Sequence, residues 1–408
     1  MRNKYTVTFI IALALILSIL GFRDILFKSK AQRLFLTSWN ELKTEYYDKT
    51  LNHQDWNKWR DKYIDQIQTE EDAYVAIDSI IESLNDPYTR FLRPEEFEEQ
   101  NIGINAKLYG IGVNISEING KTIVVSVLEG SPAQKAGIKA GDILTKVNDT
   151  EIKGFKINDV AKLVRGPVDS KVQLKILRDK TAIIYNIKRE EIKIKTVKLN
   201  ITDNIAHITI SSFLSQDTPT EVQQALEKSQ KTKGIILDLR GNTGGLLPNA
   251  VIIANMFIPS GNIVSIVDRN GKSTKIEAIT NYDYIQKPLV ILINEGSASA
   301  SEILSGALKD YNRAILVGEK SFGKGLVQKI ETIQKNNGLN ITIAKYLTPL
   351  GTDINKKGIE PDFKVKYTKE DFLKHQDPQL DKAKEIINTY KKITAEAENQ
   401  PIEYTTNK

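Results

Sequence analysis

The chain has 408 residues and no cysteine, and its formal net charge of +6 comes from 57 basic and 51 acidic residues. The lack of cysteine excludes disulfides, thiolate metal sites and a cysteine nucleophile, and the dispersed charge does not point to nucleic acid as a partner. We expect room for two or three domains, ordinary roles for the three histidines, and no metal or cofactor.

Residues 1–32 form an N-terminal membrane or signal segment. Its apolar run from Tyr5 to Phe22 has about the length of one membrane span, at the short end of the range. No small-residue cleavage motif follows at Ile19–Arg23, which favours an uncleaved anchor over a cleaved signal peptide. Arg2 and Lys4 permit the N-terminus to stay inside. We therefore expect a single-pass bacterial membrane protein with an extracytoplasmic catalytic part.

Residues 33–98 carry apolar side chains at helical spacing, such as Phe35, Trp39 and Leu42, and predict a helical N-terminal region. The helical pattern ends at Asn85–Leu92, because Pro87 breaks a helix.

Residues 99–190 change to short strands and glycine turns. The stretch Tyr109-Gly110-Ile111-Gly112-Val113 allows main-chain N–H groups to converge on a carboxylate. Together with S-P-A-x-x-A-G-I-x-x-G-D from Ser131 to Asp142, this stretch resembles a PDZ domain. The resemblance implies that an extended peptide binds as an added strand, with its terminal carboxylate in the glycine loop. The alternative is a degenerate PDZ module that serves only as a scaffold.

Residues 191–368 alternate between strands and helices, which predicts an α/β core. The buried strand Gly234–Leu239 delivers Arg240–Gly245 to a loop before the helix Leu247–Met256. Ligands of α/β folds bind at the carboxyl ends of strands, and closely spaced glycines let the backbone approach another group. This loop is therefore a candidate part of a site.

A second buried strand, Leu289–Ile293, leads into a serine-rich turn and then a helix. A hydroxyl at this junction lies beside free N–H groups and the positive end of a helix dipole, which suits a nucleophile. Ser299–Glu302 also fits the capping box S-x-x-E, so Ser299 has helix capping as an alternative role.

Lys324 has three competing interpretations. A phosphate loop, G-x-x-x-x-G-K from Gly318, fails because Gly325 replaces the magnesium-binding Ser or Thr and a strand follows. An S-x-x-K pair with Ser321 needs a helix that the flanking glycines oppose. The third is a dyad with Ser299, in which burial lowers the pKa of Lys324 so that the neutral amine takes the serine proton. Gln328 would orient that amine.

The segments N-E-G-S-A-S-A-S-E-I and G-K-G-L-V-Q resemble the carboxyl-terminal processing peptidases, also called tail-specific proteases. The resemblance extends to L-x-D-P-Y-T-x-F after the N-terminal helices and to the D-L-R-x-N-x-G-G loop. It implies an α/β, Clp/crotonase-like protease core with an inserted, β-rich PDZ domain. It also implies Ser299 as nucleophile, Lys324 as general base and Gln328 as the orienting residue. The oxyanion hole would combine the N–H of Ala300 with that of Gly244 or Gly245.

Residues 369–408 form a charged tail, helical to about Ile393, for which packing against a second subunit in a homodimer is one possibility. We predict a membrane-anchored serine endopeptidase that binds the C-terminal tails of protein substrates. The alternatives are a catalytically silent PDZ adaptor and a P-loop nucleotide-binding enzyme.

Overall fold

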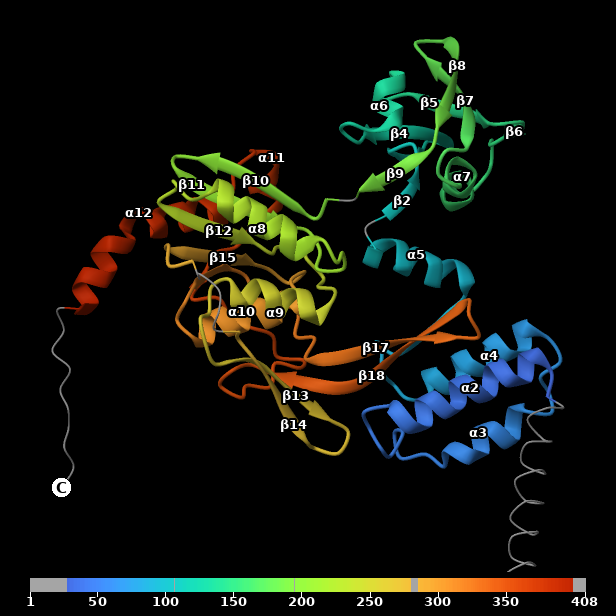
Figure 1. The fold of residues 1–408 in the computed structure, drawn as a ribbon, viewed down its shortest axis with the longest axis horizontal. Coiled ribbons are helices and arrows are strands. Elements are labelled where there is room, and N and C mark those ends of the chain that lie inside the picture. The colour runs from blue at the N-terminus through green and yellow to red at the C-terminus, as the bar shows by residue number, and fades with distance from the viewer. Residues whose placement is uncertain (1–27, 106, 194, 280–284, 399–408) are drawn as a thin grey trace, which may run out of the picture.

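The computed structural model describes residues 28–105, 107–193, 195–279 and 285–398 (Figure 1). Most of the expected membrane anchor, residues 1–27, lies outside these ranges. Within them, no helix combines the length and the apolar character that crossing a bilayer requires.

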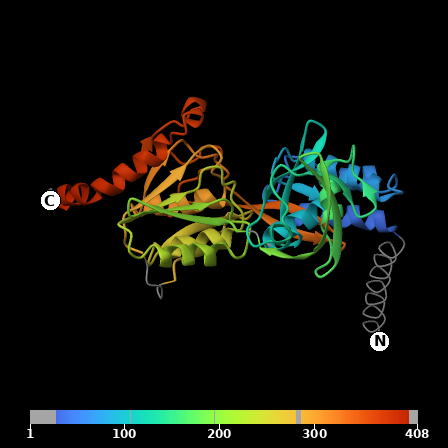
Figure 2. The same ribbon diagram turned by 90° about the horizontal axis from the view of Figure 1, so that it is seen from above.

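The N-terminal region is helical, as its apolar periodicity predicts. It contains α2 (Lys30–Glu45), α3 (Trp56–Tyr63) and α4 (Glu70–Glu82), followed by β1 (Arg90–Leu92) and α5 (Pro94–Asn105). Capping boxes start α2 at Ser29 and α4 at Thr69. The apolar faces of these helices pack against the far end of a long hairpin from the core, formed by β17 (Leu326–Ile333) and β18 (Asn337–Leu347). Figures 1 and 2 show this hairpin reaching from the core to the helices.

The PDZ-like region is a separate β-rich unit with its own apolar core. Its sheet has the strand order β3-β4-β5-β7-β8, with β6 beside β5. The strands are β3 (Val113–Ile118), β4 (Lys121–Val127), β5 (Ile143–Val147), β6 (Thr150–Glu151), β7 (Lys171–Arg178) and β8 (Thr181–Lys188); the helices are α6 (Pro132–Ala136) and α7 (Ile157–Val164). The antiparallel pair β2 (Lys107–Gly110) and β9 (Glu190–Lys193) brings the two connections to the rest of the chain together, as an inserted domain requires. The division expected at residue 98 falls inside α5.

The core is built on a six-stranded sheet with the order β10-β11-β12-β15-β16-β19, parallel except for β10. The strands are β10 (Val197–Thr202), β11 (Ile205–Ile210), β12 (Gly234–Asp238), β15 (Leu289–Ile293), β16 (Ile315–Gly318) and β19 (Phe363–Lys364). The helices α8 (Thr218–Lys228), α9 (Leu247–Asn255) and α10 (Ala300–Asp310) cover one face. Every residue of β12 and β15 is buried, as expected for strands covered on both faces.

A second sheet supports the first and has the order β1-β18-β13-β14, with β17 also paired to β18. The strands β13 (Asn262–Asp268) and β14 (Ser273–Glu277) form a hairpin with its turn at Asp268–Gly271. Strand β18 pairs with both β1 and β17. The end of the N-terminal region is therefore held against the core hairpin.

The C-terminal tail forms α11 (Lys369–Leu373) and α12 (Pro378–Glu398). Ala383, Ile386 and Ile387 of α12 pack on the face of the core sheet opposite α8, α9 and α10. This helix thus covers the second face of the sheet of its own chain.

Candidate active site

Ser299 lies at the turn between β15 and α10, with φ +55° and ψ −113°. A positive φ is uncommon outside glycine and costs about 1–3 kcal/mol, so the surroundings must impose it. The N–H of Ser299 donates to Glu302 Oε2 at 2.9 Å, which is the glutamate half of the expected capping box. The turn therefore presents Ser299 in a strained but fixed conformation at the start of a helix.

The loop after β12 is joined directly to this turn through Asn242. The N–H of Ala298 and the hydroxyl of Ser301 both donate to the carbonyl oxygen of Asn242, at 3.0 and 2.8 Å. Ser301 is completely buried, so its hydroxyl serves to hold the loop. These contacts hold the glycine loop and Ser299 side by side.

The two candidate oxyanion glycines differ in how their N–H groups are used. Gly244 (φ +101°) lies against Ser299, and its N–H donates to Asn242 Oδ1 at 2.9 Å. Within the part of the chain that the structure describes, the N–H groups of Gly245 and Ala300 have no such partner. A Cβ on Gly245 (φ +147°) would lie 2.2 Å from the main chain of Phe213. The free donors are therefore those of Gly245 and Ala300.

Glu302 joins the serine turn to the lysine loop, although its side chain is completely buried. Its Oε1 accepts from the hydroxyl of Ser321 at 2.6 Å and from Gly323 N–H at 2.7 Å. Its Oε2 accepts from the N–H groups of Ser299 and Lys324, both at 2.9 Å. All four partners are donors, so one carboxylate fixes the main chain at both candidate catalytic residues.

Tyr346 on β18 makes a second connection between the same two segments. Its buried hydroxyl lies 2.7 Å from the carbonyl oxygen of Lys324 and 3.2 Å from that of Ser299. Burial raises the pKa of Tyr346 well above its usual value, which keeps this hydroxyl a donor.

Lys324 lines a cavity of about 860 Å³ together with Ser299, Gly244, Gly245 and Gln328. Burial lowers the pKa of Lys324; the charge of Asp86 opposes this shift, that of Arg90 adds to it, and that of Glu302 opposes it. A lowered pKa increases the fraction of neutral amine, which is the form that accepts a proton. The structure thus brings the predicted nucleophile, the predicted base and the two candidate oxyanion glycines to the wall of one cavity.

Gln328 lines this cavity from β17, but its amide does not bond to Lys324 in this arrangement. Its Nε2 donates to Thr342 Oγ1 on β18 at 3.3 Å. The orienting role expected for Gln328 stays a prediction.

The other two interpretations of Lys324 find no support. The hydroxyl of Ser321 is buried, donating to Glu302 and accepting from Ile359 N–H at 2.7 Å, and residues 319–325 form no helix. The strand β17 follows Gly325, so the loop does not lead into the helix N-terminus that cradles phosphate in a P-loop.

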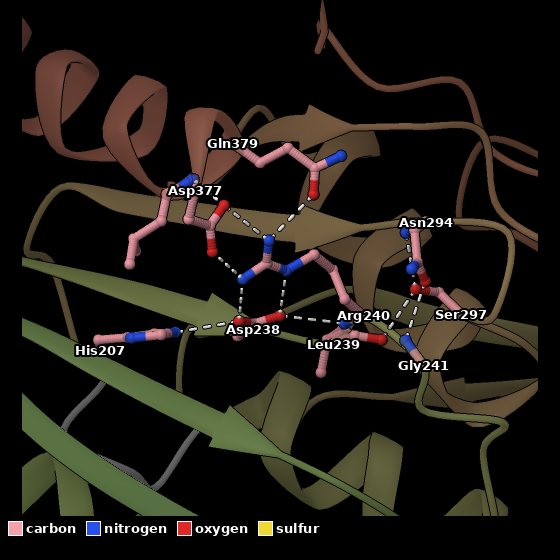
Figure 3. A network of polar contacts seen from close by, with 10 residues as sticks. His207, Asp238, Leu239, Arg240, Gly241, Asn294, Ser297, Asp377 and Gln379 are labelled. Atoms are coloured by element: carbon pink, nitrogen blue, oxygen red, sulfur yellow. Dashed lines mark hydrogen bonds and ion pairs between the residues drawn. The ribbon is translucent and has the colours of Figure 1, made fainter. Parts of the chain in front are cut away.

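A partly buried polar network around Asp238 supports the other side of the glycine loop (Figure 3). Arg240 donates to Asp238 on β12 at 2.7–2.9 Å, to Asp377 at 2.8–2.9 Å and to Gln379 at 3.0 Å, while His207 Nε2 lies 3.0 Å from Asp238. Burial alone would raise the pKa of Asp238, but hydrogen bonds from His207 and Arg240 and the charge of Arg240 hold it at about 2.

The same network reaches the serine turn. Gly241 N–H donates to Asn294 Oδ1 at 2.8 Å, and the hydroxyl of Ser297 donates to the carbonyl oxygen of Leu239 at 2.8 Å. The beginning of α12, the glycine loop and the serine turn therefore form one connected structure.

The candidate peptide site of the PDZ-like region lies between β2 and β3. The stretch 109–113 forms the end of β2 and the loop into β3, and β3 is an edge strand of its sheet. A Cβ on Gly112 (φ +79°) would lie 2.3 Å from Ser131, so this position requires glycine. An edge strand beside a glycine loop is suited to take an added peptide strand.

Sequence reasoning missed Tyr346 and recognised only part of the role of Glu302 and of Tyr88. Glu302 was expected only in a capping box, and Tyr346 carried no local signal. Tyr88, in the D-P-Y-T segment taken as the end of the helical region, lines the cavity. The resemblance of that segment to a family motif was the available sign of a role.

Comparison with known proteins gives consistent matches. Peptidase family S41 matches residues 204–365, and a PDZ domain matches residues 123–178. The chain is 37% identical over 346 residues to a carboxyl-terminal-processing protease of Synechocystis, covering 82% of this chain and 81% of the relative. It is 37% identical over 370 residues to the carboxy-terminal processing protease CtpA of Bacillus subtilis, covering 88% and 75%. Among solved structures, a photosystem II D1 C-terminal processing protease is 32% identical with a TM-score of 0.55, covering 83% of this chain and 94% of that one.

Proposed function

This chain belongs to the carboxyl-terminal-processing protease family of serine peptidases, and on that premise we propose that Ser299 and Lys324 form its catalytic dyad. The observation that carries the proposal is the pair of connections through Glu302 and Tyr346. They fix the main chain at Ser299 and at Lys324, and both residues line one cavity.

The proposed reaction is acyl transfer. Neutral Lys324 takes the proton of the Ser299 hydroxyl as its oxygen attacks the scissile carbonyl carbon. The N–H groups of Ala300 and Gly245 donate to the oxyanion, and Gly244 holds the backbone against Ser299. The Lys324 ammonium then gives its proton to the leaving amine, and water hydrolyses the acyl-enzyme with Lys324 again as base. Gln328 is proposed to contact the amine when a substrate displaces its bond to Thr342.

Cleavage of an unfolded protein with an apolar C-terminus tests this assignment. Ser299→Ala and Lys324→Ala should each abolish cleavage, measured without added nucleotide. Ser321→Ala is the matched control, and it should keep part of the activity because it loses only the bonds to Glu302 and Ile359. Full activity of Ser299→Ala would refute the proposed nucleophile.

We propose that the PDZ domain binds the C-terminal tail of a substrate along β3, with the terminal carboxylate at the N–H groups of residues 109–113. The supporting observations are the free edge of β3 and the close fit at Gly112. A peptide with a free C-terminus should bind, and the same peptide with an amidated C-terminus should not. Equal binding of both would contradict the proposal.

The location and assembly of the protein are also proposals. The apolar run from Tyr5 to Phe22 supports a membrane-attached, extracytoplasmic enzyme, which fractionation of cells and protease accessibility would test.

A homodimer is proposed with α11 at its interface, because Phe372 and Leu373 are 63% and 66% exposed. Light scattering of wild type and a Phe372→Ser, Leu373→Ser double variant would test it.

A further inference from the structure

The turn between the N-terminal helices and β1 forms one wall of the catalytic cavity. Pro87, Tyr88 and Arg90 line the cavity together with Ser299 and Lys324. The amine of Lys324 lies 4.7 Å from the centre of the Tyr88 ring, within the range of a cation–π contact. The N-terminal region therefore contributes an aromatic side chain to the base.

The turn is held rigidly in this position by its own polar groups. Asp86 accepts from Tyr88 N–H at 3.0 Å through Oδ1 and from the Thr89 hydroxyl at 2.7 Å through Oδ2. Thr89 is buried, and its oxygen accepts from the N–H of Thr342 on β18 at 3.0 Å. The hydroxyl of Thr342 is the acceptor of the Gln328 amide. The same part of β18 thus holds both the Tyr88 turn and Gln328.

We propose that Tyr88 is a positioning residue for the general base, whose ring holds the Lys324 amine in the cavity and shields it from water. The inference rests on the proposed function, because it assumes that Lys324 acts as the base. Tyr88 has no proposed contact with the scissile bond or with Ser299, and it acts through Lys324.

The ring has two opposite effects on the protonation of Lys324. Its bulk excludes water from the amine, which lowers the pKa of Lys324, whereas its π face attracts the ammonium, which raises it. Loss of hydration lowers the pKa of a buried lysine by up to several units, whereas a cation–π contact raises it by only about one unit. Exclusion of water therefore dominates, and opening the site to water should raise the pKa.

Other groups around the amine must stay constant in any test. Arg90 on β1 and Asp86 in the turn act on Lys324 with opposite signs, and Glu302 on α10 acts in the same direction as Asp86. Tyr346 on β18 contacts the Lys324 carbonyl, and α5 contributes Glu96 and Glu99 to the cavity wall. Substitution of Tyr88 alone leaves all of these charges in place.

Three substitutions separate the two effects of the ring. Tyr88→Phe keeps both the cover and the π face, so the pKa of Lys324 should match that of wild type. Tyr88→Leu keeps an apolar cover without a π face, so the pKa should fall by about half a unit or more. Tyr88→Ala admits water, so the pKa should rise by about one unit. Tyr367→Ala is the matched control, because it removes a ring from a different cation, Arg240, 5.9 Å away.

The pKa is read from the acid limb of kcat/KM against pH for the full-length enzyme. It is also read, without activity, from the pH dependence of Lys324 acetylation by acetic anhydride, followed by peptide mass spectrometry in a Ser299→Ala background. The pKa of Lys324 should be lowest in Tyr88→Leu, equal in Tyr88→Phe and wild type, and highest in Tyr88→Ala. It should be unchanged in Tyr367→Ala. This readout distinguishes a positioning role from general loss of structure.

An unchanged pKa in both Tyr88→Ala and Tyr88→Leu would overturn the inference about Tyr88 while the dyad stands. If Tyr88→Ala does not fold, the Leu and Phe variants still decide, because a Leu variant equal to wild type would exclude the ring contact. Cleavage by Lys324→Ala at the wild-type rate would instead overturn the proposed function and, with it, this inference.

Discussion

Replacement of Glu302 by glutamine tests how the site is held together. The change keeps the shape of the side chain and turns one acceptor oxygen into an NH2 donor. Wild-type Glu302 accepts four hydrogen bonds, from Ser299, Ser321, Gly323 and Lys324. In either orientation of the amide, two of these donors face another donor. The substitution therefore breaks or weakens the hydrogen bonds at Ser299 and Lys324 without leaving a cavity.

The expected cost follows from these contacts. If the NH2 group faces Ser321 and Gly323, the Ser321 hydroxyl can rotate to accept, but the N–H of Gly323 stays unpaired, at about 1–3 kcal/mol. The remaining bonds to Ser299 and Lys324 lose their charge, which weakens each by about 1 kcal/mol. Removing a buried charge recovers part of its desolvation cost. We therefore expect Glu302→Gln to lose about 3 kcal/mol of unfolding free energy and at least about tenfold in kcat.

Urea denaturation of Glu302→Gln combined with Ser299→Ala measures the stability without self-cleavage. Peptide cleavage by Glu302→Gln with Ser299 intact measures kcat. Glu295→Gln is the matched control, since Glu295 is an exposed glutamate in the same turn. The control should match wild type in both assays. A Glu302→Gln variant as stable and as active as this control would refute the proposed role of Glu302.

Three further predictions concern Gly245, Tyr346 and Asp238. Gly245→Ala should lose more than about 2 kcal/mol of unfolding free energy and abolish cleavage, because its Cβ would lie 2.2 Å from the main chain of Phe213. Gly271→Ala is the control, because Gly271 also has a positive φ but has open space around it. It should lose only about 1–2 kcal/mol, measured by thermal denaturation. Tyr346→Phe should lose about 1–2 kcal/mol of stability and reduce kcat, since it removes only the hydroxyl that holds Ser299 and Lys324; unchanged kcat would contradict this. The pKa of Asp238 is about 2 in the folded protein and 3.8 in the unfolded chain, so its contribution of roughly 2 kcal/mol is present above pH 4 and is lost as the pH falls through 2. Denaturation curves should show Asp238→Asn less stable than wild type at pH 7, with the difference disappearing below pH 2; a difference that does not change with pH would contradict this.

Much of the architecture was predictable because its signals are local. Unbroken apolar runs predicted the buried strands β12 and β15, and helical spacing predicted the N-terminal helices such as α2. The family, the α/β protease fold and the inserted PDZ domain are confirmed by the comparisons. The serine turn and the G-K-G-L-V-Q segment identified the candidate dyad, whose residue roles stay predictions.

The supporting contacts were not predictable, because they join segments that are distant in the sequence. The S-x-x-E pattern around Ser299 explains one bond of Glu302, but its bonds to Gly323 and Lys324 depend on how the lysine loop folds back. Tyr88 reaches Lys324 only because β1 pairs with β18. No periodicity or motif spacing encodes such a juxtaposition.

The most direct test of the catalytic assignment is to trap the acyl-enzyme. The full-length protein is mixed with a peptide ester, quenched in acid within one turnover and digested for mass spectrometry. We predict an acyl adduct on the hydroxyl of Ser299 that is absent from Ser299→Ala and from Lys324→Ala. An adduct on Ser321, or undiminished adduct formation in Lys324→Ala, would contradict the Ser299–Lys324 dyad.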